Sequence, residues 1–106
     1  MFARNVAIRL RPSTLSQFTQ TFEKDALPIL RKQPGFRDEI TFAYEDGTQV
    51  MAISLWDTKE QADTYNSTGY PEVLKTVEKF LDGAPKVRVA NVINSTSHKI
   101  AAEMAA

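Results

Sequence analysis

Side chains that can donate a hydrogen bond to an ionised oxygen gather in the second half of the chain, with one more near its start. They are an indole, two phenols and two amides: Trp56, Tyr65, Tyr70, Asn66 and Asn5. Donors of this kind stabilise an oxyanion when they line a pocket that excludes water. Each also has an ordinary structural role, because buried tryptophan and tyrosine often only pack a helix on a sheet, and an asparagine can end a helix. We take these five residues as candidates for contact with a substrate.

Three further polar positions carry weaker signals. Asn91 alternates with valines and an isoleucine, so we expect a buried amide that either orients a ligand or bonds its neighbours. His98 lies in a polar segment and is expected to be exposed. Asp38 and Glu39 are adjacent on a predicted strand, so they point to opposite faces and do not form a carboxylate pair.

The composition excludes several classes of function. Lysines plus arginines equal aspartates plus glutamates at 13 each, so we expect no nucleic-acid partner. The chain has no cysteine and one histidine, which argues against a metal site, and its four glycines form no phosphate-binding loop. No stretch approaches the ~20 apolar residues of a membrane span. We expect a cytoplasmic protein without metal or cofactor.

The strongest local signal is a β-hairpin over residues 36–56. Two alternating runs meet at Asp46-Gly47, which predicts a two-residue type I′ turn and pairs residues whose numbers sum to 93. One face is the more apolar and is predicted to be the core: Ile40, Phe42, Tyr44, Gln49, Met51, Ile53 and Leu55. The other face carries small and semi-apolar residues, including Ala43 and Ala52. Because both faces want cover and one chain covers only one, we expect a homodimer.

The first half of the chain otherwise predicts a strand and an interrupted helix. Alternation over 2–10 predicts the strand. Ser13 or Thr14 can cap a helix whose apolar stripe has spacings of three and four: Leu15, Phe18, Phe22, Ala26 and Ile29. Pro28 lies inside this pattern and lacks an amide donor, so the helix should kink or restart near 25–27.

The second half predicts a broken helix and a last strand. Asp57 and Glu60 form a capping box for a short helix over 58–66, and 67–69 should interrupt it. Pro71 then suits the first turn of a new helix that ends at Gly83. Alternation over 86–94 predicts the last strand.

This order of elements predicts an α+β, ferredoxin-like βαββαβ domain with a four-stranded antiparallel sheet. We expect residues 1–94 to form one domain. The tail 95–106 has an Ile100/Met104 pair at helical spacing, and we expect it to be ordered only on contact with another surface.

Several pieces together resemble the antibiotic biosynthesis monooxygenase family over about residues 2–94. They are the first helix with Pro28 ending in KQPGF, the hairpin, and the segment LWDTKEQADTYNSTGYPEVLK. The resemblance implies a dimeric α/β barrel in which two sheets pack face to face. It implies cofactor-free oxygenation of an aromatic or quinol-like substrate, with catalytic roles for Trp56 and Tyr65. Substrate contacts are expected at Asn66, Tyr70, Asn5 and Asn91.

The haem-degrading branch of that family is disfavoured. Counting from Trp56, the position of its catalytic tryptophan holds Tyr65, and the position of its iron-ligating histidine holds Lys75. Its catalytic asparagine falls at Ile8, with Asn5 as an uncertain substitute. Lysine is protonated at neutral pH and is not a usual axial ligand. Two hypotheses remain: a small cofactor-independent monooxygenase, or a non-catalytic dimeric barrel that binds a small apolar ligand.

Overall fold

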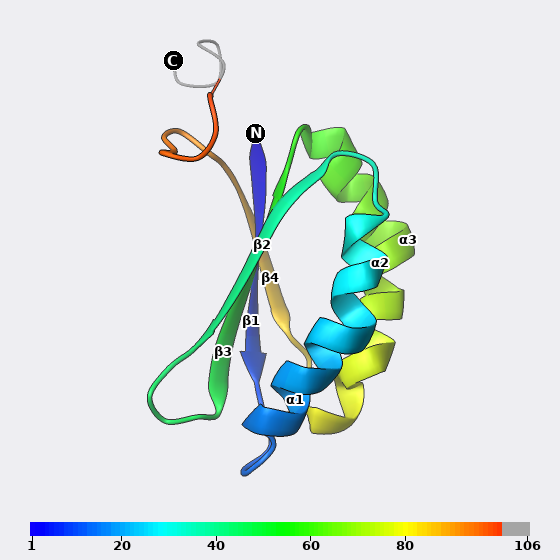
Figure 1. Cartoon of the computed structure of the whole chain (residues 1–106), viewed down its shortest axis with the longest axis vertical. Helices are drawn as coiled ribbons and strands as arrows, with labels where there is room; N and C mark the ends of the chain where they lie inside the picture. Colours follow the sequence, from blue (N-terminus) through cyan, green and yellow to red (C-terminus); the bar gives the residue numbers. More distant parts are fainter. Residues whose placement is uncertain (101–106) are drawn as a thin grey trace.

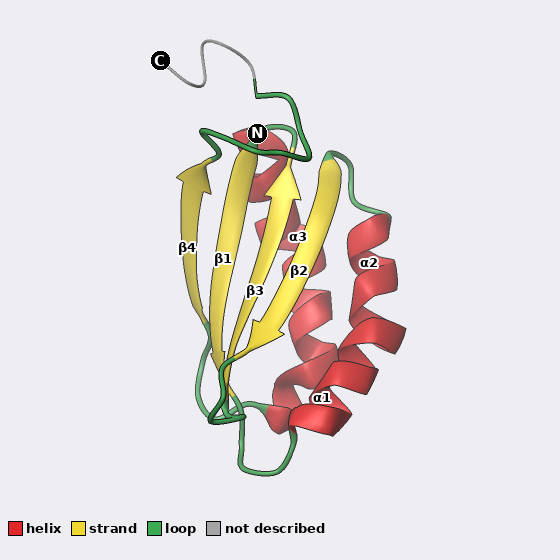
Figure 2. Cartoon of the chain, turned by 60° about the vertical axis from the view of Figure 1, so that its left-hand side comes forward, coloured by secondary structure: helices red, strands yellow, loops and turns green. Residues whose placement is uncertain are grey.

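The chain folds into one four-stranded antiparallel sheet with all its helices on one face (Figures 1 and 2). The computed structural model describes residues 1–100. The strands are β1 (Phe2–Arg9), β2 (Phe36–Ala43), β3 (Gln49–Trp56) and β4 (Lys86–Asn91). The helical elements are α1 (Leu15–Thr21), the π-helix η1 (Phe22–Ala26), α2 (Leu27–Arg31), α3 (Lys59–Val77) and the 3₁₀ turn η2 (Glu78–Phe80). The strand order β2-β3-β1-β4 confirms the ferredoxin-like α+β prediction.

The hairpin has the predicted register but a different turn. Pairs from Ala43↔Val50 to Asp38↔Leu55 sum to 93, and a bulge then shifts Phe36 onto Trp56. Gly47 has φ = 73°, whereas Asp46 is not in the positive-φ region that a type I′ turn requires at both positions. The Gly47 N–H donates to the Tyr44 carbonyl, and the Asp46 carboxylate accepts from the backbone amides of Thr48 and Gln49.

The two faces of the hairpin are exchanged relative to the prediction. Val50, Ala52, Ser54 and Trp56 are buried under the helices. The face predicted as core is open, with Ile40 61%, Phe42 41% and Tyr44 49% exposed. Small side chains on β3 let the helices approach the sheet closely, and Trp56 fills the remaining space. A face with larger apolar side chains is therefore not the face that this chain covers by itself.

The first helix changes pitch where Pro28 predicted a break. The π-helix η1 inserts a wider turn, in which the Leu27 N–H donates to the Phe22 carbonyl, and α2 then begins with Pro28 in its first turn. The extra residue moves the buried stripe from Ile29 to Leu30, so that buried positions recur every four residues: Phe18, Phe22, Ala26 and Leu30.

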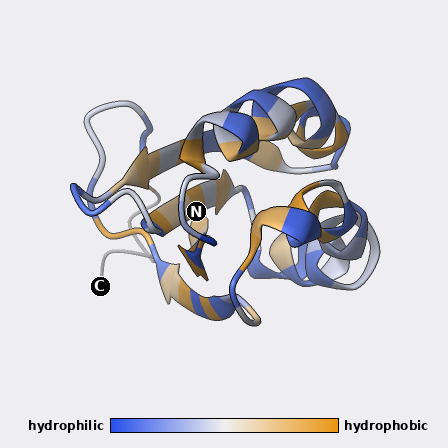
Figure 3. Cartoon of the chain, turned by 90° about the horizontal axis from the view of Figure 1, so that it is seen from below, coloured by the Kyte–Doolittle hydropathy of each residue, from blue (hydrophilic) through white to orange (hydrophobic). Residues whose placement is uncertain are grey.

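The predicted break in the second helix is wrong, because α3 is continuous from Lys59 to Val77. Thr58 caps it by accepting from the Gln61 N–H at 3.1 Å, one residue later than the predicted capping residue Asp57. The buried stripe runs through the supposed interruption: Ala62, Tyr65, Gly69, Val73 and Val77. Packing on the sheet thus overrides the missing amide of Pro71. Figure 3 shows hydrophobic and hydrophilic stretches alternating along the helices.

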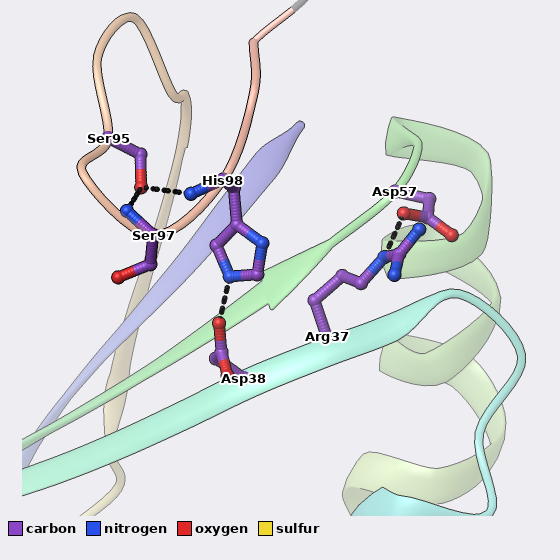
Figure 4. A network of polar contacts seen from close by, with 6 residues as sticks. All are labelled: Arg37, Asp38, Asp57, Ser95, Ser97 and His98. Atoms are coloured by element: carbon purple, nitrogen blue, oxygen red, sulfur yellow. Dashed lines mark hydrogen bonds and ion pairs between the residues drawn. The ribbon is translucent and has the colours of Figure 1, made fainter.

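The last strand is shorter than predicted, and Asn91 is exposed rather than buried. β4 is an edge strand that pairs with β1 and ends at Asn91, and all its side chains are exposed. The chain then crosses the end of the sheet, where Ser95 accepts from the His98 N–H and the His98 ring contacts Asp38 (Figure 4). The predicted Ile100/Met104 pair extends outside the described residues. Within residues 1–100, no helix is both long and apolar enough to cross a bilayer.

Candidate active site between the helices and the sheet

A row of polar residues crosses the helix-facing side of the sheet. Ser54 on β3 pairs with Arg4 on β1 and with Glu39 on β2, so the three side chains lie on one face at the same level. Arg4 is only 2% exposed, and Ser54 is 6% exposed. Their neighbours along the strands, Val6 and Ala52, are apolar and buried. The row therefore places charge inside the core of the domain.

Helix α3 completes the surroundings of Arg4. The Arg4 Nη2 donates to the Asn66 Oδ1 at 2.8 Å. Its guanidinium lies over two phenol rings, 4.9 Å from the Tyr65 centroid and 4.5 Å from the Tyr70 centroid. Tyr65 in turn stacks on Trp56 with centroids 4.7 Å apart. An aromatic wall thus surrounds one cation.

Trp56 is fixed by a bond inside the core. It has no exposed surface, and its Nε1 donates to the Ser54 hydroxyl at 2.9 Å. This satisfies its one donor, with a side-chain hydroxyl as the partner. Trp56 consequently supports the aromatic wall through Tyr65 and does not itself line the cavities described below.

Arg4 has no carboxylate partner among the described residues, where the ion pairs are Arg37–Asp57, Lys59–Asp63 and His98–Asp38. Burial lowers the pKa of Arg4, and the nearby Tyr65 opposes that shift. Burial raises the pKa of both Tyr65 and Tyr70, so these hydroxyls stay protonated near neutral pH. A buried cation without a counter-ion is costly, so an anion beside Arg4 would be stabilised.

Glu39 is the second charged group on this side of the sheet. Burial raises the pKa of its carboxyl, and the hydrogen bond donated by the Thr41 hydroxyl partly opposes the shift. Its strand neighbour Asp38 points to the opposite face of the sheet, as the alternation predicted.

Two cavities adjoin this polar row. The inner cavity, of about 30 Å³, is lined by Arg4, Glu39, Ser54, Tyr65, Tyr70 and apolar residues of β1 and α3. The outer cleft, of about 230 Å³, lies between the first helix and the hairpin and opens beside Thr41 and Phe42. Phe22 and Glu39 line both, so they separate the two spaces.

The structure brings four of the predicted site residues together and leaves two apart. Trp56, Tyr65 and Tyr70 form a connected aromatic group, and Asn66 joins it through Arg4. Their proposed roles stay predictions. Asn5 lies on the open face of the sheet, opposite Ile53 and Arg88. Asn91 lies at the exposed edge strand, opposite Phe2.

Sequence reasoning missed Arg4 and did not assign a role to Glu39. The signal for Arg4 was present, because it occupies an inward position in the alternation Phe2, Arg4, Val6, Ile8. A charged residue at such a position is rarely buried without a partner or a function. Glu39 was harder to find, because the hairpin faces had been assigned the other way round.

Comparisons with known proteins agree on the fold. No protein-family model and no curated protein sequence matches the chain. A solved structure named antibiotic biosynthesis monooxygenase superposes with a TM-score of 0.70 at 10% identity, over 89% of this chain and 100% of that one. SnoaB, a cofactor-independent oxygenase from Streptomyces nogalater, gives 0.73 at 12% identity over 92% and 97% of the two chains.

A third structure is similar over nearly the same length. It is a monooxygenase from Streptomyces coelicolor in complex with nanaomycin D, with a TM-score of 0.74 and 19% identity over 89% of this chain and 88% of that one. At these identities the likeness concerns the arrangement of elements and not the residues of the site. The chain therefore has the fold of the antibiotic biosynthesis monooxygenases.

Proposed function

We propose that the chain is a small cofactor-independent monooxygenase that acts on an aromatic, quinol-like substrate. The observation that carries the proposal is Arg4, a buried cation held among aromatic rings without a carboxylate partner in the described residues. An aromatic oxyanion would supply the missing negative charge and would stack on the same wall. The oxygenase names of structures with this fold support the same class of reaction.

The chemistry needs an electron-rich anion, oxygen and a dry pocket. A phenol and O₂ together yield a quinone and water, so the substrate itself supplies the electrons. Arg4 would stabilise the negative charge of the ionised substrate, and the hydroxyls of Tyr65 and Tyr70 would donate hydrogen bonds to charge that develops on the oxygen adduct. The cation lowers the pKa of a bound phenol and so raises the fraction present as the reactive anion.

The inner cavity must enlarge to admit a ring. Its volume of about 30 Å³ is far below the ~150 Å³ of a cavity known to bind benzene. The outer cleft of about 230 Å³ lies on the other side of Phe22. We therefore expect the Phe22 side chain, at the start of the π-helix, to turn when substrate enters from the cleft.

Oxygen uptake tests the activity. A panel of hydroquinones and phenols should show consumption of O₂ that persists after metal chelation. Arg4→Met should lower kcat/KM by roughly 10- to 100-fold, because hydrogen bonds to charged groups contribute about 1.5–3 kcal/mol. Arg9→Met is the matched control, since Arg9 lies on the same strand with its side chain exposed on the open face.

The control outcomes separate the alternatives. Absence of uptake with every substrate in the wild type would reject an oxygenase. Saturable binding of aromatic anions in a thermal-shift assay, without product, would instead indicate the non-catalytic ligand-binding barrel. Equal losses in the Arg4 and Arg9 variants would remove Arg4 from the site.

We further propose that two copies pair through the open faces of their sheets. This face exposes a band of large apolar side chains from β2, namely Ile40, Phe42 and Tyr44, next to the half-buried Met51 and Ile53 of β3. Exposed apolar bands of this kind mark interaction sites. The family resemblance implies the same face-to-face pairing, and a dimer of this class buries about 2,000 Å² or more.

A further inference from the structure

Glu39 has a position that no other polar residue of the two cavities shares. It lines the inner cavity together with Arg4 and also lines the outer cleft that opens beside the hairpin. Phe22 is the other residue common to both spaces, and it is apolar. A proton that Glu39 accepts on the side of the inner cavity can therefore leave on the side of the outer cleft.

We propose that Glu39 is the catalytic proton acceptor for the substrate, an inference that rests on the proposed oxygenase function. The substrate O–H bond breaks, its electron pair stays on the substrate as the aromatic oxyanion, and the proton forms a new O–H bond with the Glu39 carboxylate. Nothing is oxidised or reduced in this step. The proton later leaves Glu39 to water in the outer cleft.

The sheet register gives the two charges suitable places. Arg4 and Glu39 flank Ser54 on adjacent strands, so their Cα atoms lie on the order of 10 Å apart. A conjugated ring between them has one edge near the acceptor and the other near the guanidinium. The negative charge that this proton transfer leaves on the substrate delocalises over the ring toward Arg4, which stabilises it.

The surroundings of Glu39 hold its carboxyl in place and shift its pKa. The Thr41 hydroxyl donates to Glu39 Oε2, which fixes the side chain toward the helices. Titratable and charged groups that line a cavity together with Glu39 come from each element packed near it: Arg4 of β1, Tyr65 and Tyr70 of α3, Glu23 of η1, Arg31 of α2, and Arg37 and Asp38 of β2 itself. Burial raises its pKa, which moves the carboxyl toward the range in which a general base works well.

A proton count on binding tests this role without turnover. Para-nitrophenol, whose anion is yellow, is titrated anaerobically into the protein at neutral pH. Absorbance measures how much anion forms, and calorimetry in buffers of different ionisation enthalpy measures how many protons are exchanged with the buffer. Free para-nitrophenol is about half ionised at neutral pH, so binding of its anion by Glu39→Gln should release about half a proton per site. In the wild type Glu39 takes the proton of the neutral half and a further one from the buffer, so we expect an uptake of about half a proton per site. The two proteins should thus differ by about one proton per site.

The neighbouring carboxylate provides the control. Asp38→Asn makes the same chemical change one residue away on the opposite face. On binding the probe it should exchange the same number of protons with the buffer as the wild type. Glu39→Gln keeps the shape and an acceptor for Thr41, so it should fold. The same proton release by the wild type and by Glu39→Gln, or failure of the anion to form in the wild type, overturns the role of Glu39.

Kinetics separate this inference from the proposed function. With a quinol that the wild type oxidises, Glu39→Gln should lower the rate of O₂ uptake roughly 100-fold or more and remove the loss of rate at acid pH. An unchanged rate and pH profile rejects Glu39 while the oxygenase stands. Proton capture without any oxygen uptake rejects the oxygenase while Glu39 stands as the proton acceptor of an aromatic acid site.

Discussion

The two faces of the sheet differ in what they leave unsatisfied. The helix-facing side is closed by α1, α2 and α3, and yet it contains Arg4 without a carboxylate among the described residues. The open side has no buried charge but exposes Ile40 and Phe42. A negatively charged ligand would satisfy the first face, whereas a second apolar surface would cover the other. The proposed site for small molecules and the proposed interface between copies thus lie on opposite sides of one sheet.

Adjacent residues of β3 probe this difference most directly. Ala52 is buried under the helices, and Ile53 lies on the open face. A backbone step of one residue thus moves a substitution from the core of the monomer to the proposed interface between monomers.

The largest effect is expected for Val50→Asp, two residues before Ala52 on the same buried face of β3. Val50 is 2% exposed, and the cleft that it lines contains no lysine or arginine among the described residues, so a carboxylate there has no cationic partner. The free energy of unfolding should fall by roughly 3–5 kcal/mol, which is a large part of the stability of a small domain. Urea unfolding followed by circular dichroism measures the loss. Stability close to that of the wild type would show that β3 does not face the helices at this position.

Ile40→Asp should leave the fold intact and abolish the dimer. Ile40 is 61% exposed in the single chain, so the monomer loses within about 0.5 kcal/mol, whereas a charge at the interface of a dimer is not tolerated. Light scattering at micromolar concentration should give twice the monomer mass for the wild type and the monomer mass for the variant. A wild-type monomer under these conditions would contradict pairing through the open face.

Features of the fold that depend on neighbouring residues could be predicted from the sequence, whereas features that depend on distant contacts could not. Period-two alternation and Asp46-Gly47 set the strands and the register, because strand pairing in a short hairpin is decided by neighbouring residues. The inward face was assigned wrongly, since both faces are apolar and only contact with the helices distinguishes them. The helices pack on the face with the small residues Ala52 and Ser54 beside Trp56. They do not pack on the face with the larger Phe42 and Ile40.

The same reasoning explains what was found of the site. Trp56, Tyr65 and Tyr70 were identified as a group because they follow one another along the chain and face one way. Their central partner Arg4 lies more than fifty residues earlier, and only the pairing of β1 with β3 brings it to them. No local pattern predicts a contact between residues that are distant in the sequence. The alternation in β1 did predict that Arg4 points inward.

Gly69→Ala should destabilise the helix-facing layer by roughly 1–3 kcal/mol. A Cβ at this position would lie 2.8 Å from Tyr65 Cδ1 and 2.9 Å from the Gln33 side chain, and Tyr65 cannot yield freely because it stacks on Trp56. The better helix propensity of alanine, about 1 kcal/mol, offsets part of this cost. Thermal unfolding measures the balance, and a stabilised variant would show that the aromatic wall is loosely packed.

Glu39→Gln should have the smallest effect on stability, and the size of the effect depends on pH. Burial raises the folded-state pKa of Glu39 above the ordinary value of 4.5. Below 4.5 both states are protonated and the charge costs nothing. As pH rises from 4.5 through the folded-state pKa, the unfolded chain releases its proton first and the wild type loses stability; above that pKa the loss is complete.

The variant removes this loss, so its melting temperature should exceed that of the wild type at neutral pH and approach it at pH 4. Thermal unfolding across this range, at one protein concentration because association also shifts the melting temperature, measures the difference. Glu45→Gln makes the same change at an exposed position of the same hairpin and is the control. If the two variants behaved alike, the carboxyl of Glu39 would be as well solvated as that of Glu45, and Arg4 would be the one desolvated charge among the described residues on the helix-facing side of the sheet.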